Sequence, residues 1–490
     1  MVALGVCFGT AAGLPLAVGD VGAVIALCVV GALLGGLIYL MVPADQRARV
    51  ALVVALAFAL RSAFAALSIV YSVGLGGDGT FRDDQGYAYA SQAIARYLHG
   101  QPGDCLPPTW CGLRYQFGPF VYLTSGVFFV FGPDIALAEI LNSGMGAALV
   151  VFAWDLGRRV FPTSTMLPAL VIAVAPPLVA FSGLVLKDAL AVLLVAVALW
   201  ATVRFQERGQ WRFLFVALAA IEPMLSTRYY AYYALLLTLV VSMVFWCVPR
   251  RPELLARLSY RAQVLRVAGS FVLAAAMWVV NGIPSDSFVT PNDVLPRIEQ
   301  ARIGLSEGGR TSYGNPSPQP TGAPTPQPTG APAPTSALAQ SEPPRVVGSA
   351  AWWTEHGLEG NAGIQVLVRT LQHLPRGVWY ALLAPFPWAA DRLSDRLVIP
   401  DMLMWYLVAV AAPISLWKER RRWRDWFPVA FFSLVLFGLF ALAEGNVGTL
   451  YRHRAFGVMP FAAILAGPTL VATHRAIRKW LTRDHRYRRS

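Results

Sequence analysis

Two adjacent aspartates, Asp83 and Asp84, are the residues of this sequence best placed to do chemistry. They open the segment FRDDQGYAYASQAIARYLHG, which follows a long apolar stretch. A charged side chain near hydrocarbon carries a penalty of roughly 2.5 kcal/mol or more, so acids at the edge of a bilayer usually have a role. One carboxylate could be a general base or a ligand of a divalent metal, while its neighbour tunes its pKa or positions it.

A helix cap is the alternative role for this pair. Asp83 or Asp84 could accept the free N–H groups in the first turn of the helix that follows. That helix is expected to be amphipathic and to lie on the membrane surface, because four residues recur at helical spacing: Tyr87, Ala90, Ile94 and Leu98. Capping accounts for only one of the two aspartates.

Four basic residues form the second candidate set: Lys187, Arg228, Arg452 and Arg454. They fall at the outer ends of apolar segments, where the bias of membrane proteins toward cytoplasmic positive charge disfavours them. One such cation could simply extend toward lipid headgroups. Four from distant parts of the chain indicate an anion site, and the forked donors of arginine suit phosphate. Asp188 is expected to be the counter-ion of the adjacent Lys187.

Membrane helices must position these residues. Of the 490 residues, 56% are hydrophobic and only 14% are charged, which is not the composition of a soluble domain. Runs such as residues 21–41, 50–71, 189–203 and 230–248 approach or exceed the ~20 apolar residues of a spanning helix. The sequence predicts an all-α polytopic membrane protein with about twelve transmembrane helices.

The distribution of arginines predicts the orientation. The arginine-rich segments fall on one side when the spans alternate: residues 47–49, 158–159, 204–208, 250–251, 418–424 and 475–489. The positive-inside rule makes that side cytoplasmic, with both termini there and the candidate residues on the outer face of the inner membrane. The formal net charge of +13 therefore reflects topology; it could attract anionic lipid and indicates no nucleic-acid partner.

Two long outer loops divide the chain. The second loop contains PQPTGAP twice, a composition that cannot build a packed core and is expected to form a disordered tether. The expected organisation is as follows: two extra N-terminal spans over 1–49, a core over 50–282 with the first outer loop at 74–118, an outer loop over 283–398 with the tether at 314–344, C-terminal spans over 399–475, and a basic tail over 476–490.

Two apolar segments are expected at the membrane interface. Residues 117–131 are too short to cross comfortably, and residues 374–388 resemble a surface helix ending in a Pro-Phe-Pro turn. Trp388 suits an aromatic belt at the level of the headgroups, and it could equally stack on a sugar ring.

Cys105 and Cys111 lie in the first outer loop, in DCLPPTWCG, where an oxidising exterior permits a disulfide. Their spacing fits no metal site, and the histidines show no HxxH or HExxH pattern. A Walker motif and a nucleophile elbow are also absent from the sequence. If the protein transfers a chemical group, this absence argues against a cytoplasmic nucleotide as the donor of that group.

The order of these parts resembles the GT-C glycosyltransferases, a superfamily that includes protein mannosyltransferases and bacterial aminoarabinose transferases. The matching residues of the first outer loop are Asp83, Tyr87 and Gly100. Other similar segments are YQFGPFVYLTSGVFFVFG, ALAEILNSGMGAALVVFAWDLGRRVF and YRHRAFGVMPFAAILAG. Glu139 departs from the pattern, because family members often have an arginine at this place.

The resemblance implies a GT-C-like helical bundle and a specific chemistry. Family members transfer a sugar from a polyprenyl-phosphate carrier to an acceptor on the outer face, which implies a glycan, lipid or protein acceptor of the cell envelope and an inverting reaction. Asp83 or Asp84 would deprotonate or orient the acceptor, or bind the divalent metal that assists some members. Donor phosphate would be held by the basic set: Lys187, Arg228, Arg452 and Arg454.

Two other functions compete with glycosyl transfer. A glycan polymerase or ligase would also need outer cations, for a lipid pyrophosphate. A lipid or polysaccharide transporter would place charges at mid-membrane and show inverted repeats. No convincing internal repeat is present, and the acids lie on a loop, which argues against transport.

If Cys105 and Cys111 are bridged, the freshly isolated, non-reduced protein should contain one intramolecular disulfide that closes the short Pro-containing loop. Mass mapping of peptides with and without reduction measures it. Free thiols at both positions would refute the bridge.

Overall fold

The computed structural model of the chain describes residues 21–72, 82–101, 118–164, 166–246, 260–282, 302, 362–389 and 393–487. All regular elements within these ranges are helices, as the sequence predicts. The chain divides into two compact units: unit 1 comprises Met1–Ser287, Ala390–Phe437 and Arg454–Ser490, and unit 2 comprises Phe288–Ala389 and Gly438–His453.

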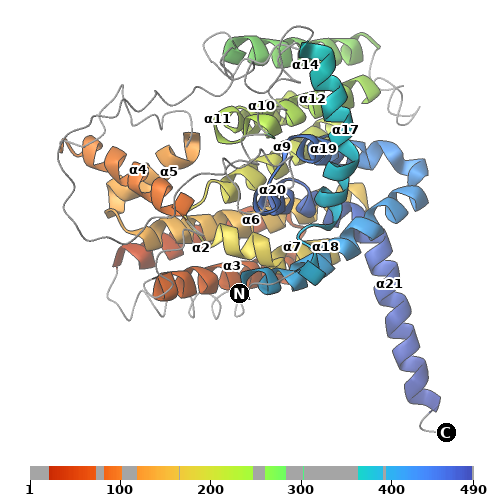
Figure 1. Ribbon diagram of the computed structural model, residues 1–490, viewed down its shortest axis with the longest axis horizontal. Coiled ribbons are helices and arrows are strands. Elements are labelled where there is room, and N and C mark those ends of the chain that lie inside the picture. Colours follow the sequence, from red (N-terminus) through yellow and green to blue (C-terminus); the bar gives the residue numbers. More distant parts are fainter. Residues whose placement is uncertain are drawn as a thin grey trace, which may run out of the picture. The chain divides into compact units, whose positions relative to one another are not determined.

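Unit 1 contains most of the helices (Figure 1). They are α2 (Val21–Met41), α3 (Arg47–Ser72), α4 (Arg82–Leu98), α5 (Gly118–Phe131), α6 (Ile135–Val160), α7 (Met166–Val174), α8 (Pro176–Ser182), α9 (Asp188–Arg208), α10 (Trp211–Ile221), α11 (Met224–Thr227), α12 (Tyr229–Trp246), α14 (Tyr260–Gly282), α18 (Leu393–Lys418), η3 (Arg420–Arg422) and α21 (Met459–Tyr487). The unit boundaries fall within α19 (Trp423–Ala443) and α20 (Val447–Gly457).

The number of spans differs from the expectation. Among the described residues six helices are long and apolar enough to cross a membrane, or seven if the bent pair α20 and α21 counts as one span. Twelve spans are therefore not confirmed. The physical reason is that apolar content alone does not make a spanning helix: α12 is apolar but short, and prolines divide the segment of α7 and α8.

Helix α6 lies at the centre of unit 1, where it packs against α2, α3 and α9. Glycines permit the close approach of two of these neighbours. A Cβ at Gly144 would lie 2.6 Å from Cγ1 of Val30 in α2, and one at Gly146 would lie 2.5 Å from Nε of Arg61 in α3. Contacts this short leave no room for a methyl group, so small residues on α6 determine how tightly α2 and α3 pack.

Arg61, in the middle of the apolar helix α3, is fully buried. Its Nε donates to Oγ of Ser182 at 2.8 Å, and its Nη1 donates to the carbonyls of Ala57 and Ala173, both at 2.9 Å. Its Nη2 donates to the carbonyl of Ile172 at 3.3 Å. The guanidinium is thus bound by neutral oxygens on three helices, α3, α7 and α8.

The Pro-Pro pair between α7 and α8 explains why carbonyls are available to Arg61. In an α-helix the carbonyls of Ile172 and Ala173 would accept the N–H groups of residues 176 and 177. Both of these are prolines, which have no N–H. An unsatisfied carbonyl in a membrane interior costs several kcal/mol, so the arginine supplies the donors that the prolines lack.

Unit 2 is described over α17 (Ala362–Leu383), η2 (Pro387–Ala389), Arg302 and the residues of α19 and α20 that belong to it. Gly377 of α17 packs directly against the backbone of Ala441, because a Cβ there would lie 1.7 Å from the carbonyl oxygen. Nδ1 of His453 and Oε1 of Glu444 form a hydrogen bond, and the His453 ring stacks on the ring of Phe440. The helix expected over 374–388 corresponds to the last part of α17, followed by the short 3₁₀ turn η2.

Several expectations concern residues outside the described ranges. These are the span beginning at Met1, the tether at 314–344, most of the loop at 74–118, and the Cys105–Cys111 bridge. They stay predictions, as do the domain boundaries. The short helix expected over 117–131 is present as α5, and its place at the membrane interface also stays a prediction.

Substituting Arg61 with Met should lower the free energy of unfolding by about 3 kcal/mol or more, because at least two buried carbonyls lose their donors. Thermal unfolding of the purified protein in detergent measures this. Arg49→Met, at an exposed position of the same helix, is the matched control and should have little effect.

A second background tests the cause. Pro176→Ala with Pro177→Ala restores both N–H donors, so Arg61→Met should cost clearly less in that background than in the native one. An equal cost in the two backgrounds would contradict the link between the prolines and the arginine.

Candidate functional site

An ion pair between Asp188 and Arg228 joins segments that are 40 residues apart. Asp188 is the first residue of α9, and Arg228 lies between α11 and α12. The carboxylate side chain is 1% exposed and the guanidinium 15% exposed. Burial acts to lower the pKa of Arg228, but the Asp188 carboxylate outweighs it and holds the pKa above its ordinary value. Arg228 is therefore a permanent, fixed cation.

Lys187 is half-buried and precedes Asp188 directly. Its Nζ lies 5.9 Å from the ring centroid of Tyr87, within the range of a cation–π contact. The sequence led us to expect Asp188 as a counter-ion of Lys187. The ion pair seen at Asp188 is with Arg228, and a role of Asp188 as counter-ion of Lys187 stays a prediction.

The loop that carries Lys187 is held by α6. Asn142 of α6 donates from Nδ2 to the carbonyl of Leu186 at 2.9 Å and also to the carbonyl of Leu184. The loop starts at Gly183, where a Cβ would lie 2.9 Å from the carbonyl oxygen of Arg61. The loop before α9 is thus fixed between α3 and α6, and this positions Lys187.

Tyr87 belongs to the amphipathic helix predicted over the first outer loop, which is α4. Tyr87 is 6% exposed and packs edge-on against Phe120 of α5, with ring centroids 5.7 Å apart. Figure 1 shows α4 and α5 side by side, and Ser91 links them by donating to the carbonyls of Tyr87 and Val121. The ring thus reaches from α4 to Lys187 of the loop before α9.

The predicted face of α4 is confirmed over most of its length. Tyr87, Ala90 and Ile94 are buried in one hydrophobic cluster, as their spacing predicts. Leu98 is 54% exposed, because the helix ends there and Gly100 turns the chain at a φ of 74°.

The aspartate pair lies in the first turn of α4, which begins at Arg82. Neither aspartate therefore precedes the helix as an N-cap would, although a carboxylate inside the first turn also interacts favourably with the helix dipole. Position 83 is one turn before Tyr87, so the two positions share a face of α4. The roles of Asp83 and Asp84 stay predictions.

The other predicted residues lie elsewhere in the structure. Arg454 is buried in unit 1, with its Nη2 2.9 Å from Sδ of Met402 and its guanidinium 4.9 Å from the ring centroid of Trp405. Arg452 and Trp388 belong to unit 2. Trp388 is 74% exposed and leans on Phe386, so both of its predicted roles stay open.

Metal binding is not supported by the side chains that the structure describes, among which no three His, Cys, Asp or Glu residues cluster closely enough to hold an ion.

Sequence reasoning did not identify Arg61 and Asn142, which organise this region. Both had a signal. Arg61 is an isolated charge in the apolar run ALAFALRSAFAAL, and Asn142 is an isolated amide in α6. A polar residue within a predicted span requires a partner, and the Pro-Pro pair was an available source of unpaired carbonyls.

Comparison with known proteins gives one family. The sequence profile described as dolichyl-phosphate-mannose-protein mannosyltransferase matches residues 119–278, about a third of the chain. This segment contains Asn142, Lys187, Asp188 and Arg228. The match confirms the resemblance to this family of the GT-C superfamily. No curated protein matches the chain.

Removing both charges of the buried pair tests its role. Asp188→Leu with Arg228→Met should leave the protein folded, because replacing a buried ion pair by apolar residues is often neutral. Arg228→Ala alone should be destabilising by about 3 kcal/mol, since it leaves Asp188 charged and buried. Unfolding temperatures of the two variants, with exposed Arg96→Ala as control, measure this. A double variant as unstable as the single one would contradict the account.

Proposed function

We propose that this chain, which resembles the dolichyl-phosphate-mannose-protein mannosyltransferases over residues 119–278, is a membrane glycosyltransferase. It transfers a sugar from a polyprenyl-phosphate carrier to an acceptor of the cell envelope on the outer face of the membrane. The observation that carries the proposal is the arrangement of Tyr87, Lys187 and the Asp188–Arg228 pair. Tyr87 is one helical turn after position 83 on α4.

The two cations suit the donor phosphate. A polyprenyl-phosphate sugar carries a phosphodiester, which becomes more negative as the bond from the sugar to the phosphate oxygen breaks. Fixed positive groups that face this developing charge stabilise the transition state without reorganising. Asp188 and the loop held by Asn142 keep Arg228 and Lys187 in place before the donor binds. A role of Arg452 and of Arg454 in binding the donor stays a prediction from the sequence.

An aspartate of α4 suits the acceptor. In an inverting transfer the carboxylate takes the proton of the acceptor hydroxyl, the hydroxyl oxygen attacks the anomeric carbon, and the carrier leaves as polyprenyl phosphate. Asp83 is the first choice as base because of its spacing to Tyr87, and Asp84 is the alternative. Tyr87 contributes an aromatic face beside Lys187, against which a sugar could pack.

Asp83→Asn should reduce sugar transfer by about 100-fold or more while the protein still folds and binds donor, because a general base typically contributes this much. The rate is measured as sugar transfer from a radiolabelled polyprenyl-phosphate sugar in isolated membranes. Donor binding is measured as the amount of radiolabelled donor that the protein retains. Asp84→Asn tests the alternative assignment.

Asp134→Asn is the matched control. Asp134 caps α6 by accepting from the N–H of Ala136 at 2.9 Å, and asparagine caps nearly as well, so transfer should be retained. Near-normal transfer by both Asp83→Asn and Asp84→Asn would exclude acid–base work by this pair.

A further inference from the structure

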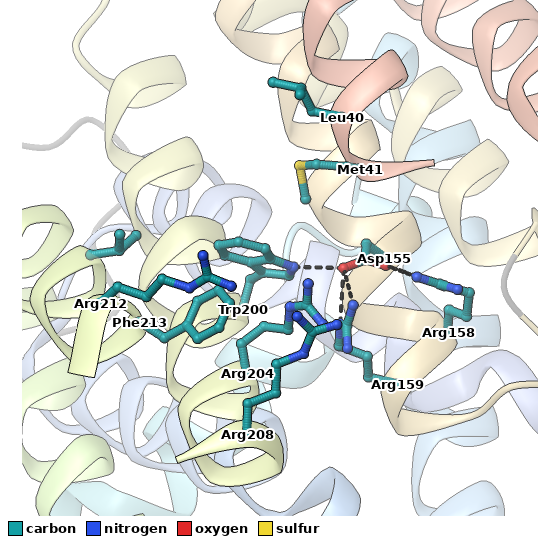
Figure 2. A pocket seen from close by; sticks show the side chains of 11 residues that line it. Leu40, Met41, Asp155, Arg158, Arg159, Trp200, Arg204, Arg208, Arg212 and Phe213 are labelled. Carbon is teal, nitrogen blue, oxygen red and sulfur yellow. Dashed lines mark hydrogen bonds and ion pairs between the residues drawn. The ribbon is translucent and has the colours of Figure 1, made fainter. Parts of the chain in front are cut away.

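A second polar cluster lies at the opposite ends of α6 and α9 from the candidate site. Here the ends of α2, α6 and α9 and the beginning of α10 surround a cavity of about 370 Å³. The residues of α9 that line this cavity, from Trp200 to Arg208, lie about 18–30 Å along the helix from Asp188. Figure 2 shows its lining: Leu40, Met41, Asp155, Arg158, Arg159, Trp200, Arg204, Arg208, Arg212, Phe213 and Val216.

The acids of this cluster are already occupied. The side chain of Asp155 is 2% exposed and accepts from Nη2 of Arg158 at 2.6 Å, from Nε of Arg159 at 2.9 Å and from Nε1 of Trp200 at 2.7 Å. Glu207, the other nearby carboxylate, forms an ion pair with Arg159. Both carboxylates therefore mainly neutralise the arginines of α6.

Among the described residues, Arg208 and Arg212 have no carboxylate partner, and Arg204 has only a distant one. Arg204 lies 3.9 Å from Glu207, at the limit of an ion pair, and its buried Nε has no hydrogen-bond partner among the described residues. Within the described part of the chain no hydrogen bond or ion pair is formed by Arg208. Arg212 donates only to the side-chain amide of Gln210, at 3.1 Å. An anion in the cavity would relieve the repulsion among these charges.

One of these three arginines, Arg204, differs in position from arginines that only define topology. Such residues extend their charged ends into water. The Arg204 side chain is 16% exposed, and that of the neighbouring Arg159 is 11% exposed, whereas Arg208 and Arg212 lie at the exposed rim of the cavity. Figure 2 shows Arg204 and Arg208 directed alongside each other toward Asp155 and Trp200, across the cavity from Met41.

The remaining lining indicates which anion fits. Leu40, Met41, Phe213 and Val216 give the cavity an apolar wall. The neighbouring side chains of Tyr39, at 66% exposed, and Leu40, at 82%, extend this apolar surface outward from the end of α2, a helix apolar enough to lie in a bilayer. A phosphate headgroup with the start of its acyl chains matches a wall of this kind beside arginines, whereas a fully hydrated anion does not.

We propose that this pocket binds the phosphate of an anionic membrane lipid, held by Arg204, Arg208 and Arg212, on the side that the arginine asymmetry assigns to the cytoplasm. The site is separate from the proposed transfer site and would anchor the ends of α2, α6, α9 and α10 to the membrane surface.

Lipid binding to the purified full-length protein tests the proposal. Phosphatidylglycerol should stay bound in native mass spectrometry and raise the unfolding temperature, and phosphatidylcholine should not. Arg204→Gln with Arg208→Gln should weaken phosphatidylglycerol binding by about tenfold or more, because it removes two charge-assisted contacts. Arg208→Gln alone, which breaks no pair within the protein, should weaken it less and guards against misfolding of the double variant.

The matched control removes the same charge elsewhere. Arg420→Gln with Arg421→Gln changes two exposed arginines at η3, on the same predicted side, and should leave binding unchanged. An equal loss in control and pocket variants would show diffuse attraction and overturn the proposal. Inorganic phosphate that stabilises the protein as much as phosphatidylglycerol would also overturn it, in favour of a soluble phosphate ligand.

Discussion

The donation of hydrogen bonds from Arg61 to the backbone around the Pro-Pro pair is the interaction on which the arrangement of unit 1 depends. A membrane offers no water to carbonyls that a proline leaves unpaired, so a helix broken inside a bilayer must obtain donors from the protein. Arg61 provides them from α3 and also binds Ser182, at the end of α8. One side chain therefore joins the break between α7 and α8 to a continuous helix.

The consequences of this contact extend toward the candidate site. Ser182 is followed by the loop that Asn142 holds, and that loop ends in Lys187 and Asp188. Gly146 lies close to the side chain of Arg61, and Gly183 lies close to its carbonyl oxygen. The loop that starts at Gly183 therefore has little room to move. The two charged residues at the beginning of α9 are in this way fixed before any substrate binds, which is what electrostatic stabilisation of a transition state requires.

Helices α6 and α9 separate two clusters that differ in character. At one end Asp188 pairs with Arg228, and the adjacent Lys187 lies beside an aromatic ring from α4. At the other end five arginines surround two acids, and two of them have no carboxylate partner among the described residues. A single pair of helices thus carries a proposed reaction site and a proposed lipid site about 18–30 Å apart along α9.

Much of the architecture followed from composition and periodicity. The all-helical membrane fold, the amphipathic α4 with its buried Tyr87, Ala90 and Ile94, and the short α5 are all readable from the sequence, because apolar length and helical spacing report on burial directly. The family resemblance was also readable, and the profile match over residues 119–278 confirms it. The number of spans could not be read from the sequence, because helices broken by proline and short apolar helices have the same apolar composition as full spans.

The partners of each charge were decided only by the tertiary structure. Sequence adjacency suggested Lys187 as the partner of Asp188, and it could not show that the fold also brings Arg228 to this carboxylate from 40 residues away. Arg204, Arg208 and Arg212 counted in the sequence only toward orientation, and the packing of four helix ends turned them into the wall of a cavity. A charge in a sequence reveals that a partner is needed, because burial without one is costly. Which partner it finds depends on distances between helices, and these are set by packing that no local pattern records.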